Sequence, residues 1–220
     1  MQERKLDRIF AACGIGSVVL DLAGTFVQVG PKDTHNLTWA SGDAAIAKAF
    51  AHHATTTVWV GAYLEVVAMV LFVPFAVWAG RRLGGGALGA TAAGMGIANV
   101  AVSMVSLGLL DAEAYLAGHG TPLAVAKALV VLNGACYVTT WFLTAGFLVA
   151  LAPLALGDGR RVLGWSAAAI AAYTLVATAA DARTTGQFSV PLSMVWIICA
   201  CVVLARGERG RARVAVPAAA

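Results

Sequence analysis

The sequence predicts an all-α bundle of six transmembrane helices with both chain termini in the cytoplasm. Apolar residues make up 60% of the 220 residues and charged residues only 12%, whereas an average soluble domain has roughly 25% charged residues. Six apolar stretches are long enough to cross a bilayer, and the basic residues are distributed unevenly between the loops that join them. Such a composition excludes a disordered chain, a coiled coil and an ordinary cytosolic enzyme.

Each predicted span contains about 20 predominantly apolar residues, because a helix rises 1.5 Å per residue. The spans are residues 10–29, 57–79, 87–110, 134–156, 162–180 and 188–205, and together they form one membrane domain, residues 1–220. The first span follows a basic segment as a signal peptide does. It runs on for about 20 residues with no convincing cleavage site, so we expect a retained helix. Residues 122–133 precede the fourth span and either extend it, tilt it or lie on the membrane surface.

Basic residues gather on one side of the predicted membrane. Eleven Lys and Arg residues lie in the two termini and in the second-to-third and fourth-to-fifth connections, and four lie on the opposite side. Because basic loops remain in the cytoplasm, this distribution places both termini there. Nucleic-acid binding is not expected, since no continuous basic patch with interleaved aromatic residues is present.

A short amphipathic helix is predicted on the outer side at residues 42–54. Ser41 is expected to cap it, and Asp43 lies in its first turn, where the helix dipole favours an anion. Ile46, Phe50 and His53 share one face at helical spacing. We expect this helix to lie on the outer membrane surface, either as a lid over a cavity or as a passive surface helix.

Two carboxyl groups lie inside predicted spans, Asp21 in the first and Glu65 in the second. A charge at the bilayer centre costs about 2.5–3.5 kcal/mol on insertion scales, so both are candidates for function. Each lies roughly 12 Å inside the outer boundary, and consecutive helices usually pack together. We therefore expect the pair to share one proton, as in proton coupling, cation binding or general-acid catalysis. The alternative is two neutral carboxyls that only stabilise the bundle.

Other polar and aromatic residues in the outer halves of the spans are candidates for lining a cavity. Asp111 and Glu113 end the third span and are expected at the cavity mouth. The full set of predicted binding residues is Tyr63, Asn99, Asp111, Glu113, Tyr137, Trp141, Phe142 and Trp196. No cofactor or metal site is predicted, because the four cysteines and four histidines form no ligand pattern.

The opening RKLDRIFAACGIGSVVLDLAG, the outer SGDAAIAKAF and the six-span layout resemble a family of uncharacterised bacterial six-helix membrane proteins, known as a domain of unknown function. This resemblance implies a location in the bacterial inner membrane and no defined activity. A fainter resemblance is to the integral-membrane terpene cyclases, compact helix bundles in which acidic residues protonate an isoprenoid. It implies that Glu65 is the matching acid.

Three functions are compatible with these observations. The first is binding or transport of a small hydrophobic or cationic solute, with Asp21 and Glu65 as the proton- or cation-binding pair. The second is an integral-membrane enzyme acting on a lipid or isoprenoid, with Glu65 as the general acid and Trp141, Phe142 and Trp196 shaping the pocket. The third is a structural or regulatory membrane subunit. The composition requires the lipid bilayer as a partner, and a homo-oligomer remains open.

Overall fold

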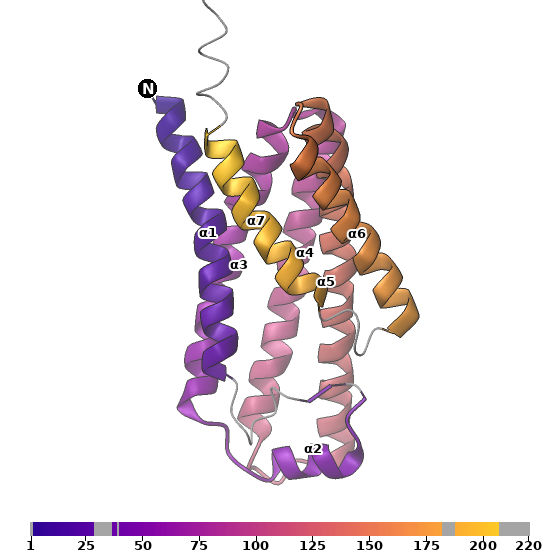
Figure 1. The fold of residues 1–220 in the computed structure, drawn as a ribbon. Helices are drawn as coiled ribbons and strands as arrows, with labels where there is room; N and C mark the ends of the chain where they lie inside the picture. Colours follow the sequence, from indigo (N-terminus) through magenta and orange to yellow (C-terminus); the bar gives the residue numbers. More distant parts are fainter. Residues whose placement is uncertain (1, 29–36, 39, 182–187, 207–220) are drawn as a thin grey trace, which may run out of the picture.

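The computed structural model describes residues 2–28, 37–38, 40–181 and 188–206, which form seven α-helices and no strand (Figure 1). In chain order these are α1 (Gln2–Gln28), α2 (Asp43–Phe50), α3 (Thr56–Arg82), α4 (Gly86–Leu116), α5 (Leu123–Gly157), α6 (Arg161–Asp181) and α7 (Ser189–Arg206). All except α2 are long and apolar enough to cross a membrane. The prediction of an all-α bundle of six spanning helices is confirmed.

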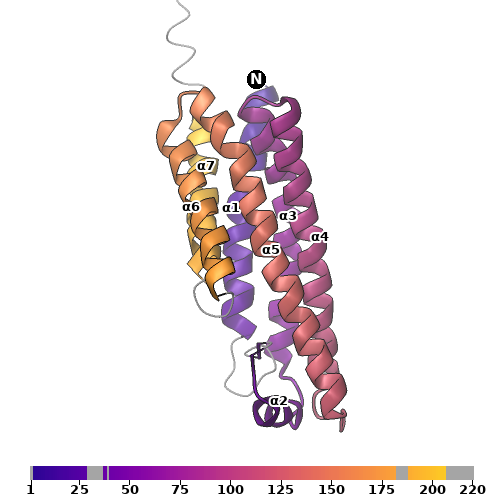
Figure 2. The same cartoon turned by 90° about the vertical axis from the view of Figure 1, so that its right-hand side faces the viewer.

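The six long helices form a ring. Helix α1 packs on α3, α3 on α4, α4 on α5 and α5 on α6, and α7 closes the ring between α6 and α1. Helices α6 and α7 lie toward the end that holds the start of α1, and α4 and α5 extend farthest toward the other end, where α2 lies (Figures 1 and 2). We call these the inner and outer ends, following the orientation predicted from the basic residues.

Aromatic side chains fill the inner half of the bundle. Their ring centroids lie 5.7 to 6.4 Å apart in tilted or edge-to-face arrangements, involving Phe72, Phe75, Trp78, Phe147 and Trp196. The Trp78 indole Nε1 also donates a 2.6 Å hydrogen bond to Asp7 Oδ1, which joins α3 to α1 near the inner end. Offset and edge-to-face aromatic pairs add to the free energy gained by burial, so this half forms a well-packed core.

Glycines allow two pairs of helices to touch through their backbones. A Cβ atom on Gly24 of α1 would lie 2.8 Å from the carbonyl oxygen of Gly61 on α3, and one on Gly61 would lie 2.7 Å from that of Gly24. Gly80 of α3 and Gly89 of α4 make the same kind of contact, at 2.5 and 2.7 Å. Because no side chain fits at these distances, the two crossings set the register of α1, α3 and α4.

Helix α5 begins at Leu123, eleven residues before the predicted span. Of the three alternatives for residues 122–133, which were to extend the helix, to tilt it or to lie on the membrane surface, the structure shows that they mainly extend the helix. No Pro or Gly interrupts the apolar sequence before Asn133. At 35 residues, α5 is about 52 Å long, whereas the hydrocarbon core of a bilayer is about 30 Å thick. The outer ends of α4 and α5 therefore reach beyond the membrane core and provide a platform for α2.

The start of α2 differs from the prediction. The N-cap residue is Gly42 and no side chain caps the helix. The Ser41 hydroxyl instead accepts a 2.9 Å hydrogen bond from the backbone N–H of Thr38. The prediction of Ser41 as the cap was therefore wrong, because its side chain closes the preceding turn. The helix also ends at Phe50, so His53 lies outside it.

The apolar face of α2 is covered by the protein. Ile46 and Phe50 are buried against Ala126 and Val130 near the start of α5. The backbone N–H of Gly118, between α4 and α5, donates a 2.8 Å hydrogen bond to the carbonyl oxygen of Phe50. The expected contact of this face with the membrane surface is replaced by docking on the ends of α4 and α5, since these helices project far enough to meet it.

Candidate functional site

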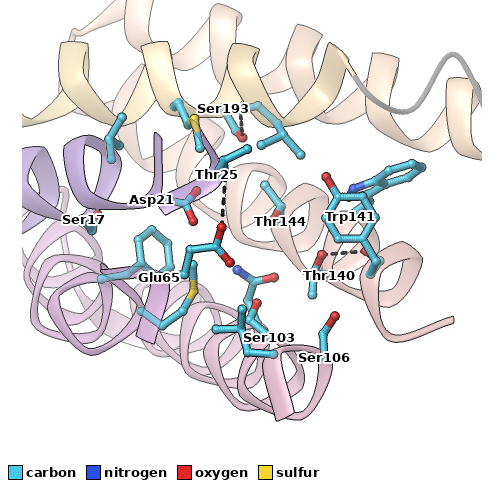
Figure 3. Close-up of a pocket in the computed structure, with 18 of the residues that line it drawn as sticks. Ser17, Asp21, Thr25, Glu65, Ser103, Ser106, Thr140, Trp141, Thr144 and Ser193 are labelled. Carbon is cyan, nitrogen blue, oxygen red and sulfur yellow. Dashed lines mark hydrogen bonds between the residues drawn. The ribbon is translucent and has the colours of Figure 1, made fainter. Parts of the chain in front are cut away.

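A cavity of about 530 Å³ lies between α1, α3, α4, α5 and the first turns of α7. The aromatic rings of Phe72 and Phe147 separate it from the inner core. Its polar and indole-bearing lining residues are Ser17, Asp21, Thr25, Thr38, Glu65, Asn99, Ser103, Ser106, Asn133, Tyr137, Thr140, Trp141, Thr144 and Ser193. Figure 3 labels several of them, among them Asp21, Glu65 and Trp141. No Lys, Arg or His is among the described residues that line it.

Asp21 and Glu65 lie at the same depth in this cavity. Counted from the contact between Gly24 and Gly61, Asp21 is three residues toward the inner end on α1 and Glu65 four residues toward it on α3. At 1.5 Å per residue, their depths differ by only about 1.5 Å. Figure 3 shows the two carboxyl groups next to each other and directed into the cavity. The structure thus brings together the two residues that the sequence singled out.

The carboxyl pair has no cationic side chain beside it in the described cavity wall. Glu65 is only 8% exposed, and its Oε1 accepts a 3.2 Å hydrogen bond from Thr25 Oγ1. Glu65 is buried and Asp21 is half-buried, so two ionised carboxylates in this position would repel each other and lose part of their hydration. The pair therefore requires a proton or a bound cation to balance its charge.

Three of the other predicted residues lie in the cavity wall: Asn99 of α4, and Tyr137 and Trp141 of α5. The Tyr137 and Trp141 rings meet edge to face with their centroids 5.2 Å apart. Asn99 Oδ1 is buried and has no hydrogen-bond partner in the part of the chain that the structure describes. An acceptor in this position is available to a ligand.

Tyr63, Phe142 and Trp196 lie elsewhere, contrary to prediction. Tyr63 is 68% exposed and Phe142 48% exposed on the outside of the bundle. Tyr63 precedes Glu65 by two residues and Phe142 follows Trp141 by one, which turns them about 200° and 100° away from the cavity. Trp196 faces the inner core, where its Nε1 donates a 3.0 Å hydrogen bond to the carbonyl oxygen of Leu163.

Asp111 and Glu113 do not line the cavity, although we expected them at its mouth. Helix α4 continues to Leu116, so Glu113 is enclosed by protein and only 1% exposed. Glu113 Oε1 and Asp111 Oδ1 are buried and without a hydrogen-bond partner among the described residues. Glu113 is therefore not the solvated helix end that the sequence suggested, because α4 continues past the predicted end of the span, whereas Asp111 is half-buried.

The cavity also contains residues that sequence reasoning missed. Ser106 Oγ of α4 donates a 2.6 Å hydrogen bond to Asn133 Oδ1 of α5, which joins the two helices across the cavity wall. Asn133 was missed because the predicted span began one residue later. Thr25 and Ser103 each follow a predicted residue by four positions on the same helix face, so helical spacing would have found them.

In the part of the chain that the structure describes, no three His, Cys, Asp or Glu residues are grouped to hold a metal ion. Comparison with protein-family models, with curated proteins and with solved structures gave no match to this chain. The resemblances drawn from the sequence therefore remain predictions.

Proposed function

We propose that this membrane protein is a carrier that binds a small amphipathic cation in the cavity and exchanges it for a proton at Asp21 and Glu65. The observation that carries this proposal is the pairing of two carboxyl groups at one depth in a cavity whose described wall has no basic residue. A cation is the ligand class that this distribution of charge attracts most strongly.

The size and lining of the cavity favour an organic cation. A volume of 530 Å³ falls within the range of roughly 300–1,000 Å³ that is usual for small-molecule sites. Apolar and aromatic residues, including Met69, Phe72, Trp141 and Phe147, form much of the wall. Such side chains stabilise the apolar body of a ligand, and aromatic faces attract its positive charge.

Proton exchange follows from the charge of the carboxyl pair. Without a ligand, one proton shared by Asp21 and Glu65 relieves their repulsion. A bound cation supplies the positive charge instead, so the proton leaves as the cation arrives. The same carboxyls then bind either species, and this competition is the coupling step that an exchanger needs.

The shape of the bundle supports loading of the cation from the outer end. The aromatic core closes the inner half beyond Phe72 and Phe147. The cavity instead extends outward as far as Thr38, Leu110 and Asn133. In this conformation the outer half holds the ligand, and release on the inner side requires the aromatic core to open.

Calorimetric titration of the purified protein with 4-phenylbutylammonium tests the binding step. We expect binding by the wild type and by Asp43→Asn, which changes an exposed carboxyl on α2, and none by Asp21→Asn or Glu65→Gln. Uptake into proteoliposomes driven by a pH gradient then tests transport. Binding that survives in both cavity variants would overturn the proposal.

Mass spectrometry of cells that express the wild type or Glu65→Gln tests the other two functions. An isoprenoid or lipid product made only by the wild type would replace the carrier proposal with the enzyme. A structural subunit would tolerate both carboxyl substitutions and copurify with another protein.

A further inference from the structure

Five of the nine hydroxyl-bearing residues that line the cavity use their hydroxyl hydrogens within the protein. Three donate to backbone carbonyl oxygens of their own helices, namely Ser17 to Gly14 at 2.8 Å, Thr140 to Tyr137 at 2.6 Å and Ser193 to Val190 at 2.8 Å. A hydroxyl has one hydrogen and two lone pairs. Once the hydrogen is used in this way, the group has only acceptor capacity left for a ligand.

Two further hydroxyls of the wall donate to side chains. Thr25 Oγ1 donates to Glu65 Oε1 at 3.2 Å, and Ser106 Oγ donates to Asn133 Oδ1 at 2.6 Å. Five hydroxyls that line the cavity therefore have their hydrogens committed to protein acceptors. The hydrogen bonds thus leave this wall richer in acceptors than its residue composition suggests.

Acceptors without donors also lie in the cavity wall beside the carboxyl pair. Asp21 accepts no hydrogen bond from any residue that the structure describes, and Asn99 Oδ1 is buried without a partner. Each ionised carboxylate offers about four lone-pair positions. Buried acceptors left without donors cost free energy, so a ligand that supplies hydrogen atoms is bound more tightly than one that supplies charge alone.

We propose that the cavity selects cations that carry several N–H donors, and that it prefers a primary ammonium group to a quaternary one on the same apolar body. This inference rests on the proposed cation binding and names the class of ligand. In this proposal the three N–H bonds of a primary ammonium group pair with oxygen atoms of Asp21, Glu65 and Asn99, which all line the cavity. A quaternary ammonium group has the same charge but leaves these acceptors unpaired.

The opposite wall holds one buried donor that lacks a partner. Trp141 Nε1 has no acceptor within hydrogen-bonding geometry in the described residues. A hydroxyl or carbonyl oxygen on the body of the ligand would pair with it. The ammonium group accordingly belongs at the carboxyl end of the cavity, and a neutral acceptor on the ligand belongs beside α5.

The test is calorimetric titration of the full-length wild type with four ligands: 4-phenylbutylammonium and its N-methyl, N,N-dimethyl and N,N,N-trimethyl derivatives. We expect the Kd to rise with each methyl group, and the primary ion to bind about tenfold or more tightly than the quaternary one. The variant Asn99→Leu should reduce this ratio, whereas Thr91→Val, which changes an exposed hydroxyl on the same helix, should leave it unchanged.

The outcomes separate this inference from the proposed function. Equal binding of the four ions, or tightest binding of the quaternary ion, would overturn the preference for N–H donors while cation binding stands. Failure of all four to bind a monodisperse, folded wild type would overturn both. A third outcome is that millimolar Na⁺ displaces the primary ion and that methylation does not change the Kd. This outcome would identify a metal cation as the ligand and would also overturn the inference.

Discussion

Gly24 of α1 and Gly61 of α3 are in direct backbone contact, and this contact places Asp21 and Glu65 opposite each other. Each carboxyl lies about one turn from the contact toward the inner end, Asp21 before Gly24 and Glu65 after Gly61 on antiparallel helices, so both point into the cavity at one depth. A side chain at either glycine would move the helices apart. The geometry of the proposed binding pair thus depends on two residues that carry no functional group.

Gly24→Ala is expected to weaken both the fold and the site. The added Cβ would meet Gly61 O at 2.8 Å and Glu65 Cγ at 2.6 Å, and overpacking of this kind typically costs about 1–3 kcal/mol. Thermal unfolding in detergent and titration with 4-phenylbutylammonium measure the two effects. Gly94→Ala is the control, because nothing lies within 4 Å of a Cβ there. Equal effects of the two substitutions would argue against the backbone contact.

Cation binding should release about one proton, since the cation replaces the proton shared by the carboxyl pair. A proton competes for the same site, so lowering the pH should weaken binding. Calorimetry in buffers of different ionisation enthalpy counts the protons released. Asp43→Asn should behave as the wild type does. A Kd that is independent of pH, together with no proton release, would contradict the exchange mechanism.

Glu113→Leu is expected to stabilise the fold by about 1 kcal/mol or more. Glu113 is fully buried, and its Oε1 has no hydrogen-bond partner among the described residues. Replacing such a group with an apolar side chain of similar volume removes the cost of its desolvation. The midpoint of thermal unfolding measures the change. A lower midpoint would show that the second carboxyl oxygen of Glu113 is held by a hydrogen bond, for which Asn133 is the neighbouring donor.

Helix α2 should be held by apolar contacts more than by its ion pair. Phe50→Ala is expected to cost about 3 kcal/mol of local stability, because it removes a buried ring packed on α5. Lys127→Ala breaks an exposed ion pair with Asp43, 2.6 Å long, and should cost less than about 1 kcal/mol. Hydrogen exchange of residues 43–50 compares them. Faster exchange in the Lys127 variant than in the Phe50 variant would reverse this ranking.

The predicted orientation can be tested with single cysteines in a background where the four native ones are replaced. Gly42→Cys lies at the outer end and Ala87→Cys at the inner end, and both positions are exposed. A membrane-impermeant maleimide should label Gly42→Cys in intact cells, and Ala87→Cys only after permeabilisation. The opposite pattern would reverse the assignment drawn from the basic residues.

The depth of the carboxyl pair was predictable from the sequence, because helical rise converts residue counts into distances along a span. The rotation of each helix was not. Glu65 faces the cavity, whereas Tyr63, two residues away, faces outward. The sequence of α3 has no periodic pattern that would distinguish these two faces, because apolar residues cover both of them. In a membrane the outside of a helix is as apolar as its buried side, so hydrophobicity does not reveal which face packs inward.

The sequence by itself determined the fold class and the positions of the six long helices, because these depend on local composition and on the thickness of the bilayer. Tertiary structure alone decided which side chains share the cavity, why Glu113 is buried and what covers α2. Those outcomes depend on how helices rotate and how far they project. The rotation of each helix and the distance by which it projects are determined by backbone contacts between distant glycines and by packing between residues far apart in the chain.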